Sequence, residues 1–455
     1  MKVAFIRPKP SPFTIGLQHL MVVEPLELEM MATLIQNEHE TVIVDMILEK
    51  KPIERVITEI NPDILCLTGY ITHIQVMIEY CSLAKKLFPD IITIAGGVHI
   101  EKFPEDIDDP VIDYRVVRNA TRTFPKLIDF LNNKSGFPAG VLRTGEILNE
   151  EILPEYDFYV PVPDRSLTKK YRKNYFYVFH DKVALIKTSF GCPFTCKFCF
   201  CREITGRKYY ERPMNEIIDE LESIEEKEVY IIDDDFLLNP ERVGLFISHL
   251  KEKKINKKFL VYGRADFIAD NPEMMKHFKE CGLRTVIVGL ESFDEMELSG
   301  FDKKTSGNIN RKAMSVLNEN KIDCYAAIII SPSWTKDDFS KAWKIMKELK
   351  IKFVNLQPLT PLKGINLDVD ESSIILKRED YAKWDLAHVS IKPVHMSVSE
   401  FYAELLRLYE KILFNPANIL SSLKYPLKMQ WKMMKGLRKV HRQYKNRIIE
   451  VKEYV

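Results

Sequence analysis

The chain has 455 residues, of which 46% are hydrophobic and 11% aromatic, which excludes a largely disordered protein and predicts about two to three domains. The 66 Lys and Arg residues nearly balance the 65 Asp and Glu residues, and the net charge of +1 excludes a protein whose whole surface binds a polyanion. No apolar run approaches the about 18 residues of a membrane-spanning helix, and the first residues predict a buried strand rather than a signal peptide.

The first part of the chain alternates short apolar runs with helical patterns. The expected strands are Val3–Ile6, Thr41–Val44, Ile64–Leu67 and Ile91–Ala95, and the expected helices are Leu26–Ile35 and Val76–Phe88. Strands that alternate with helices predict a Rossmann-like, doubly wound parallel sheet. Such a sheet binds ligands beyond the carboxyl ends of its strands. We expect this α/β domain to cover residues 1–131.

A second series of strands and helices follows an irregular, proline-containing connector, which we place at 132–180. The expected strands are Val183–Lys187, Val229–Ile232, Phe259–Tyr262, Thr285–Val288, Ala326–Ile330 and Phe353–Leu356. Helical stretches such as Met214–Ile224 and Phe339–Leu349 separate them. Six such units predict a partial (β/α)6 barrel over 181–365, with its chemistry at the carboxyl ends of the strands. Residues 366–455 lose this rhythm and predict a mainly helical C-terminal region.

The eight cysteines are too few for a disulfide scaffold in a chain of this length. Four of them are scattered and are expected to be small buried hydrophobic residues: Cys66, Cys81, Cys281 and Cys324. The other four are clustered: Cys192, Cys196, Cys199 and Cys201. Clustered cysteines of this kind indicate a metal centre in the reducing cytoplasm.

The cluster forms a Cys-x3-Cys-x2-Cys motif directly after the first barrel strand. The thiolates of Cys192, Cys196 and Cys199 can converge from one loop on one iron–sulfur cluster. Three ligands instead of four would leave one iron open to a substrate or cosubstrate. The alternative is a structural zinc site, which needs a fourth ligand that Cys201 would have to supply.

This motif, with Phe198 before its last cysteine, resembles the radical S-adenosylmethionine (SAM) superfamily. The resemblance implies that Cys192, Cys196 and Cys199 hold a 4Fe–4S cluster. It also implies that SAM chelates the open iron and is cleaved reductively to a 5′-deoxyadenosyl radical. An electron donor such as flavodoxin or ferredoxin is then expected.

Further motifs stand at the ends of the next barrel strands, where the same resemblance places SAM-binding groups. Asp234 and Asp235 follow the second strand, Arg264 the third and Glu291 the fourth. Together with Phe198, these residues are the expected SAM-binding set. Taken singly, each acidic or basic residue is more often part of a solvated loop than a ligand.

The N-terminal domain resembles the cobalamin-binding domain of radical SAM enzymes that also use cobalamin. The matching pieces are Glu24–Leu26, Thr68–Tyr70 and Gly96–His99. The residues expected to contact cobalamin are Tyr70, Thr72, His73, Gly96 and Gly97. No Asp-x-His-x-x-Gly motif supplies a lower ligand to cobalt, so bound cobalamin would be base-off without a histidine ligand. The alternative for His73 is that it is an ordinary loop residue that does not contact cobalamin.

Within these enzymes, the chain is most similar to the hopanoid C-3 methylase type of class B radical SAM methyltransferases. The supporting pieces are Thr68–His73, Tyr262–Asp266, Leu359–Gly364 and Trp384–His388. The resemblance implies methylation of an unactivated carbon of a lipid-like or peptidyl substrate. The alternatives are a radical SAM cyclase or oxidoreductase of the same architecture, an enzyme whose first domain has lost cobalamin, and a non-catalytic binding protein.

Three segments depart from the pattern of these enzymes. The usual Pro-Leu-Gly is Pro25–Glu27, a Gly-rich acidic segment is replaced by Arg118–Arg122, and the Gly-rich turn after the fifth barrel strand is replaced by Ile330–Trp334.

The stretch Ser421–Arg447 is basic, contains no acidic residue and is interleaved with apolar residues. It allows three interpretations. The first is a solvated helix that caps the barrel. The second is a peripheral membrane helix with Trp431 and the methionines at the headgroups and the lysines on anionic lipid. Nucleic-acid binding is the third and least favoured, because no basic–aromatic platform accompanies the stretch.

Overall fold

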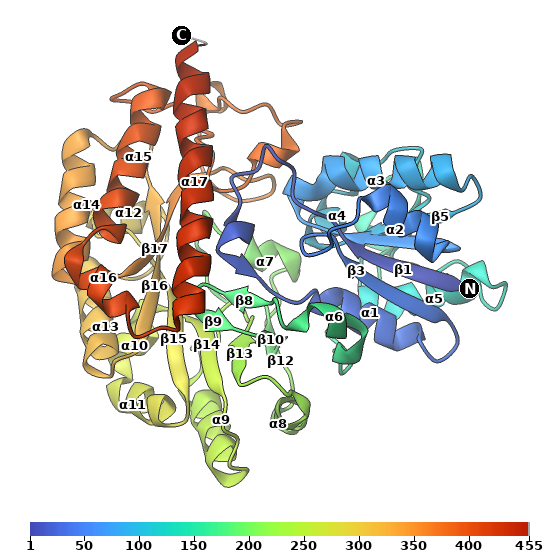
Figure 1. The fold of residues 1–455 in the computed structure, drawn as a ribbon, viewed down its shortest axis with the longest axis horizontal. Coiled ribbons are helices and arrows are strands. Elements are labelled where there is room, and N and C mark those ends of the chain that lie inside the picture. The colour runs from blue at the N-terminus through green and yellow to red at the C-terminus, as the bar shows by residue number, and fades with distance from the viewer. Residues whose placement is uncertain (454–455) are drawn as a thin grey trace. The chain divides into compact units, whose positions relative to one another are not determined.

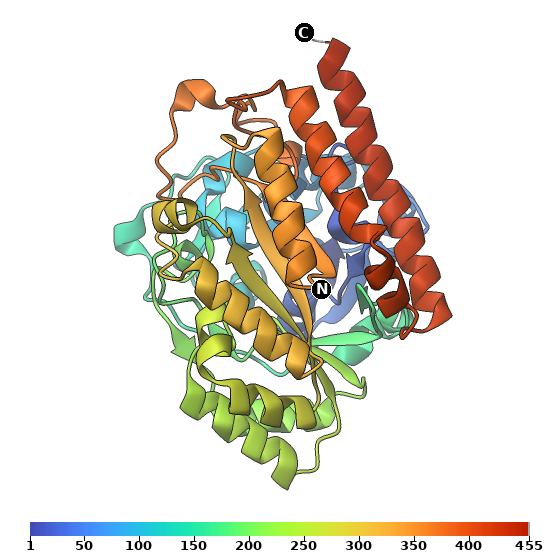
Figure 2. The same ribbon diagram turned by 90° about the vertical axis from the view of Figure 1, so that its left-hand side faces the viewer.

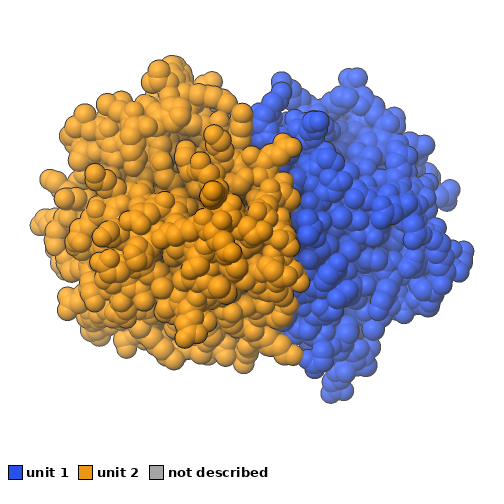
Figure 3. All heavy atoms as spheres, turned by 90° about the horizontal axis from the view of Figure 1, so that it is seen from below, with its two compact units in different colours: residues 1–14, 24–175, 379–385 blue, residues 15–23, 176–378, 386–455 orange. Residues whose placement is uncertain are grey.

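The computed structural model describes residues 1–453 and divides the chain into two compact units (Figure 3). Unit 1 contains residues 1–14, 24–175 and 379–385, and unit 2 contains residues 15–23, 176–378 and 386–455. Each unit therefore includes a short segment from a distant part of the sequence. No helix in the described part of the chain is both long and apolar enough to cross a membrane.

Unit 1 is built on a six-stranded sheet (Figure 1). Its strands are β1 (Lys2–Arg7), β3 (Glu40–Asp45), β4 (Ile64–Thr68), β5 (Ile92–Gly96), β6 (Tyr114–Val116) and β7 (Val141–Arg143). They lie in the order β3-β1-β4-β5-β6-β7, and all neighbours are parallel except β6 and β7. The expected doubly wound parallel sheet is confirmed, and β7 adds an antiparallel edge strand from the segment that we expected to be a connector.

Helices cover both faces of this sheet, because its strands are apolar on both sides. The helices are α1 (Leu26–Ile35), α2 (Ile53–Ile60), α3 (Ile74–Leu87), α4 (Val98–Lys102), α5 (Ala120–Leu131) and α6 (Lys169–Arg172). Side chains of α1 and α5 pack with Val3 and Phe5 on one face. Those of α2 and α3 pack with Ala4 and Ile6 on the other.

The order of the parallel strands fixes where unit 1 can bind a ligand. Counted in chain order, the five parallel strands are arranged 2-1-3-4-5, which is the flavodoxin-like order. The chain therefore leaves the sheet in opposite directions from β1 and β4. The crevice between the carboxyl ends of these two strands is the ligand site of such folds.

Unit 2 contains a second sheet of six parallel strands in simple sequential order. They are β10 (Val183–Ile186), β13 (Glu228–Ile231), β14 (Lys258–Gly263), β15 (Leu283–Glu291), β16 (Asp323–Ile330) and β17 (Phe353–Pro358). Each overlaps one of the six expected strands, so the predicted (β/α)6 partial barrel is confirmed. The intervening helices lie along the outer face of the strands (Figure 2).

The helices of unit 2 fall into a barrel set and a C-terminal set. The barrel set is α8 (Met214–Ser223), α9 (Pro240–Glu252), α10 (Ala265–Asp270), α11 (Pro272–Glu280), α12 (Glu295–Gly300), α13 (Gly307–Glu319) and α14 (Lys336–Glu348). The C-terminal set is α15 (Val398–Leu413), α16 (Pro416–Ser422) and α17 (Leu427–Glu453). Residues 366–397 between them form no α-helix, so the expectation of a mainly helical C-terminal region holds only from Val398 onward.

Two small sheets complete unit 2. One has the order β2 (Met21–Val22), β8 (Phe176–Tyr177) and β9 (His180–Asp181), so an N-terminal segment pairs with the strand that precedes the barrel. The other pairs β11 (Ser189–Phe190) with β12 (Tyr210–Glu211) and closes the base of the loop that carries the cysteine motif.

Candidate functional site

The cysteine motif lies in the loop between β11 and the short helix α7 (Cys201–Ile204), at the carboxyl end of the first barrel strand. Gly191 starts the loop with a φ of +78°, and a Cβ there would lie 2.1 Å from the carbonyl oxygen of Lys208. Only glycine fits this position. Cys192, Cys196 and Cys199 follow as free, partly exposed thiols, all in unit 2.

The first two aspartates after β13 hold this loop in place. The buried carboxylate of Asp233 accepts hydrogen bonds from the Thr188 backbone N–H at 2.6 Å and from the Ser189 hydroxyl at 2.7 Å. The carboxylate of Asp234 accepts one from the Gly191 N–H at 3.0 Å. Asp234, which we expected to bind SAM, therefore contacts the base of the cysteine loop.

Asp235 differs from its two neighbours. Its side chain is buried, and neither carboxylate oxygen has a hydrogen-bond partner among the described residues. Burial raises the pKa of Asp235 to about 8, although Arg264 and Lys303 oppose the rise. A buried carboxylate without a partner is costly, and such groups mark places where a ligand supplies the missing donor. The ammonium group of SAM is a donor of this kind, so Asp235 fits the expected role.

Two cations face the cysteine loop. The guanidinium of Arg264 stacks on the Phe194 ring, with its carbon 3.7 Å from the ring centroid, and its Nη1 lies 4.0 Å from Sγ of Cys196. Nζ of Lys303 lies 5.8 Å from the centroid of the Phe198 ring. Burial raises the pKa of Cys196, whereas both cations act to lower it. The site thus supplies positive charge where thiolates must form.

Glu291 lies at the end of β15, where the register to β16 shifts. Its backbone has a φ of +58°, and its carboxylate turns back toward Gly289, where a Cβ would lie 2.3 Å from Oε1. Oε1 accepts a bond from Nζ of Lys303 at 2.9 Å. The structure therefore pairs Glu291, the expected SAM ligand, with a lysine that was not among the expected site residues.

The segment Phe301–Lys303, which follows β15 and α12 in the chain, forms hydrogen bonds with the cysteine loop. The Lys197 N–H donates to the Phe301 carbonyl at 3.0 Å, and the Thr195 hydroxyl donates to Asp302. The Phe198 ring, expected near SAM, packs edge-on against Phe301 with centroids 5.5 Å apart. No local motif in the sequence marks this segment.

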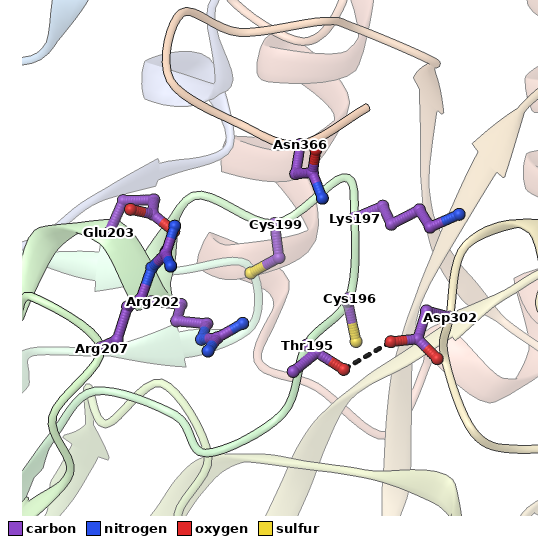
Figure 4. Close-up of a pocket in the computed structure, with 9 residues that line it drawn as sticks. All are labelled: Thr195, Cys196, Lys197, Cys199, Arg202, Glu203, Arg207, Asp302 and Asn366. Atoms are coloured by element: carbon purple, nitrogen blue, oxygen red, sulfur yellow. Dashed lines mark hydrogen bonds and ion pairs between the residues drawn. The ribbon is translucent and has the colours of Figure 1, made fainter. Parts of the chain in front are cut away.

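A pocket of about 190 Å3 opens beside the loop (Figure 4). Its lining is rich in charged side chains and includes two of the three motif cysteines. The lining residues are Thr195, Cys196, Lys197, Cys199, Arg202, Glu203, Arg207, Asp302 and Asn366.

Cys201 has a supporting place next to the motif. A hydrogen bond with Cys201 is the main cause that lowers the pKa of Cys199, and Cys201 itself is raised well above its usual pKa. The structure therefore places the Cys201 side chain beside that of Cys199. Among the described residues, no three His, Cys, Asp or Glu side chains are grouped around a single metal-ion position.

In unit 1, three of the five residues expected to contact cobalamin follow β4, one of the two strands that border the crevice. Tyr70, Thr72 and His73 follow β4, and the Tyr70 side chain is largely exposed. Nδ1 of His73 accepts from the Tyr70 N–H at 3.3 Å, which places the ring proton on Nε2. Burial lowers the pKa of His73 to about 4, so the ring is neutral at pH 7.

The two expected cobalamin glycines behave differently. Gly97 has a φ of +114°, and a Cβ there would lie 2.7 Å from the Gly69 carbonyl oxygen, so it allows the loops after β4 and β5 to approach each other. Gly96 has free space, since its nearest neighbour would be Val116 at 3.9 Å. The close approach at Gly97 is thus made by the chain's own backbone.

Residues far along the sequence also reach this crevice. The short 3-10 helix Tyr381–Lys383 belongs to unit 1 and packs against the 3-10 helix Ile71–His73. The Thr14 hydroxyl fixes it by donating to the Ala382 carbonyl at 2.9 Å. No local pattern in the sequence predicts this contribution.

The segment Arg118–Arg122, which differs from the sequence pattern of cobalamin-dependent radical SAM enzymes, has a structural role within unit 1. The Arg118 guanidinium lies 3.9 Å from the centroid of the Tyr156 ring. The Asn119 side chain donates to the Glu155 carbonyl at 2.6 Å and accepts from the Asp157 N–H at 2.9 Å. This segment therefore anchors residues 155–159 to the sheet.

Comparison with known proteins agrees with both units. The sequence model of the Radical SAM superfamily matches residues 186–344, and that of the B12 binding domain matches residues 15–128. The chain is a radical SAM protein with a B12-binding domain. The first match contains the cysteine loop, and the second contains Tyr70, His73, Gly96 and Gly97.

Relatives of this radical SAM protein span most of its length. It is 27% identical over 425 residues to the hopanoid C-3 methylase of Methylococcus capsulatus, which covers 90% of this chain and 81% of the relative. It is 22% identical over 386 residues to the anaerobic magnesium-protoporphyrin IX monomethyl ester cyclase of Rubrivivax gelatinosus, which covers 81% of this chain and 69% of the relative.

Solved structures share its fold. The radical SAM methyltransferase TsrM from Kitasatospora setae, with cobalamin and a [4Fe-4S] cluster bound, matches with a TM-score of 0.66 at 14% identity and covers 98% of this chain and 99% of TsrM. The cobalamin-dependent radical SAM enzyme OxsB matches with a TM-score of 0.62 at 15% identity, over 90% of this chain and 61% of OxsB.

Proposed function

We propose that this protein is a cobalamin-dependent radical SAM methyltransferase that methylates an unactivated carbon of a lipid-like or peptidyl substrate. The similarity to a hopanoid methylase over 90% of this chain supports the reaction and the lipid-like class. The single structural observation that carries the proposal is the unpartnered buried carboxylate of Asp235, held behind the three-cysteine loop.

The residues present fit both cofactors of such an enzyme. Cys192, Cys196 and Cys199 offer three thiolates for a 4Fe–4S cluster, and Tyr70 and His73 lie at the crevice where unit 1 would hold cobalamin. When bound, the cluster supplies an electron for SAM cleavage and cobalamin carries the methyl group.

The chain's own side chains have separate tasks around SAM. Asp235 would accept the ammonium group of SAM, since its oxygens have no other donor. Arg264 and Lys303 supply positive charge beside the anionic sulfurs. Glu291, held by Lys303, would accept a ribose hydroxyl or the amino group, because both are hydrogen-bond donors.

The test is anaerobic purification with cobalamin supplied, followed by reconstitution with iron and sulfide. We expect four irons and one cobalt per chain, as the two cofactors require, from metal analysis and visible spectra. Cys192→Ala, Cys196→Ala and Cys199→Ala should each abolish reductive formation of 5′-deoxyadenosine from SAM. Retention of that product in any of these variants would overturn the cluster assignment, and iron without cobalt would remove cobalamin from the proposal.

Product mass separates methylation from the alternative reaction class. The reconstituted enzyme would be incubated with SAM that carries a deuterated methyl group, a reductant and a lipid extract. A product that gains one labelled methyl group supports the proposal. A product that has only lost hydrogen atoms would favour a cyclase or oxidoreductase, the class named by the Rubrivivax relative, which has less support here.

We also propose two partners for this reaction. An electron donor such as flavodoxin or ferredoxin would deliver electrons near the cysteine loop, where Lys197, Arg202 and Arg207 line the pocket and suit an acidic carrier. The second partner is a membrane surface, contacted peripherally through the stretch Ser421–Arg447.

A further inference from the structure

An exposed apolar patch lies where α16 turns into α17. Its side chains are each between 48% and 74% exposed, which is unusual for six large apolar residues so close together in the sequence. The members, here called the apolar tip, are Phe414, Ile419, Leu420, Leu423, Leu427 and Trp431. Two perpendicular views place α16 beside the start of α17 (Figures 1 and 2).

The tip is held outward by contacts on its inner side. Nζ of Lys424 lies 2.8 Å from both carboxylate oxygens of Asp323 at the start of β16, and the Tyr425 hydroxyl donates to the same carboxylate at 2.7 Å. The Tyr425 ring stacks on Phe179 with centroids 4.0 Å apart. The turn between α16 and α17 is therefore fixed to the barrel, and the apolar side chains around it cannot fold inward.

The inner face of α17 is likewise packed against the rest of unit 2. Met429 and Met433 are buried in unit 2, so these two methionines do not reach the headgroup zone as the sequence suggested. Gly436 lies against the N-terminal segment, since a Cβ there would be 2.1 Å from the His19 carbonyl oxygen. The outer face of α17 is left for a partner.

The charge around the tip is one-sided. Between Glu410 and Glu450 the sequence has no carboxylate and ten Lys and Arg residues, in a chain whose net charge is only +1. Helical spacing places Leu427, Trp431 and Met434 on one outer face, and the same face continues with Arg438, Arg442 and Lys445. These steps of three or four residues give an apolar end of the outer face, followed by a basic part that is here called the basic stem.

The basic stem is available for an external anion. Lys435, Arg438, Arg442 and Lys445 are exposed, and none of them forms an ion pair with another described residue. A second copy of the chain would bring an equally positive stem to the same place, which opposes self-association. A partner with an apolar interior and a densely anionic surface would match both the apolar tip and the basic stem.

We propose that the apolar tip inserts into the interface of an anionic phospholipid bilayer while the basic stem of α17 lies against the headgroups. Membrane binding would bring the enzyme to a lipid-like substrate, and this purpose rests on the proposed function. The binding itself does not depend on that function. Trp431 has the position and chemistry of an interfacial anchor. The binding is reversible and weakens with salt, because the basic stem acts within a Debye length of the lipid surface.

The experiment is flotation of the full-length protein with phosphatidylcholine vesicles, with and without phosphatidylglycerol. We expect binding to the anionic vesicles and much weaker binding to neutral ones. The triple variant Leu420→Ser/Leu423→Ser/Leu427→Ser should bind about tenfold more weakly. The matched control Met296→Ser/Ile375→Ser/Val394→Ser changes three exposed apolar residues of the same unit and should bind like the wild type.

A charge variant tests the basic stem, and a fluorescence signal tests the apolar tip. Lys435→Glu/Arg438→Glu should weaken binding to anionic vesicles by roughly fivefold or more per charge. The tryptophan emission should shift to the blue on binding, and Trp431→Phe should abolish the shift.

Three outcomes would overturn the proposal: no binding to anionic vesicles, equal binding of the tip triple variant, or loss of a dimer in that variant without a change in flotation. The last result would assign the tip to a second copy. Formation of 5′-deoxyadenosine from SAM without lipid should be the same in the tip variant as in the wild type. A failure of the proposed methyl transfer would leave the vesicle results unchanged, so the two tests are independent.

Discussion

Nζ of Lys303 lies 2.9 Å from Oε1 of Glu291, and both side chains are buried beside the cysteine loop. Burial opposes the charge on Lys303, but Glu291 and the Cys196 thiolate together raise the pKa of this lysine. The pair therefore fixes a positive charge next to the sulfur that a cluster would use. This charge is part of the site, although no sequence motif announces it.

Replacing this lysine should affect both stability and redox behaviour. Lys303→Met leaves Glu291 buried without its cation and should lower the free energy of unfolding by about 3 kcal/mol. Loss of positive charge near the cluster should also lower its reduction potential, measured by redox titration of the reconstituted enzyme. Lys303→Arg keeps the charge and should retain most of the potential. A potential that is the same in both variants would show that Lys303 acts only structurally.

Asp235→Asn should weaken SAM binding and at the same time relieve a pH-dependent destabilisation. Folding raises the pKa of Asp235 to about 8, whereas an unfolded Asp ionises near about 4. The folded state therefore binds more protons in this interval, and the free energy of unfolding falls as pH rises from about 4 to about 8. The asparagine variant lacks this contribution, so its stability should fall less over the interval.

Two measurements check this prediction. Urea denaturation of the cluster-free protein at several pH values gives the slope for the wild type and the variant. Equilibrium dialysis of SAM against the reconstituted enzyme gives the affinity, which we expect to drop about tenfold or more because an ammonium partner loses its carboxylate. Unchanged SAM affinity would remove Asp235 from the binding site.

The fold was largely predictable because its elements are strongly patterned. Leu26–Ile35 was expected as a helix and is one with the same bounds; Pro25 precedes it, most of its residues are apolar, and most are buried. β7 was missed because it is a three-residue edge strand with no alternation to detect. Likewise, the segment Tyr381–Lys383 joins unit 1 through tertiary contacts that no local pattern encodes.

The site was predictable where its residues are neighbours in the sequence. The cysteine motif is one continuous loop, so its spacing alone pointed to an iron–sulfur cluster. The triplet Asp233–Asp235 was recognised, but its individual roles depend on which way each carboxylate points: two of them hold the loop and one is left without a partner. Lys303 depends on a distant pairing with Glu291 and could not be read from the sequence.

Gly191→Ala should damage the cysteine loop. The backbone at this position is left-handed, and a Cβ would lie 2.1 Å from the Lys208 carbonyl, so we expect a loss of about 2 kcal/mol or more in stability. The displaced loop should also retain less iron after reconstitution, measured by metal analysis. Gly300→Ala is the matched control, because nothing lies within 4 Å of a Cβ there. Equal iron content in the two variants would contradict the geometry.

His73→Gln should leave the visible spectrum of bound cobalamin unchanged. Nδ1 of His73 accepts from the Tyr70 N–H, so Nε2 carries the proton and has no lone pair to offer to cobalt. The electron paramagnetic resonance spectrum of the cob(II)alamin form should likewise show no nitrogen coupling from the protein. A nitrogen splitting in the wild type that disappears in the variant would show that the imidazole does ligate cobalt.

Tyr425→Phe should destabilise the protein more than Lys424→Met, although both residues bind the same carboxylate of Asp323. The Tyr425 hydroxyl and Asp323 are both buried, and a hydrogen bond to a buried carboxylate contributes about 1.5–3 kcal/mol. The Lys424 side chain is 42% exposed, so solvent screens its ion pair and its loss should cost less than about 1 kcal/mol. Urea denaturation of both single variants and of the double variant would measure these terms and their coupling. A larger loss for Lys424→Met would mean that the ion pair, rather than the tyrosine, fixes the turn that presents the apolar tip.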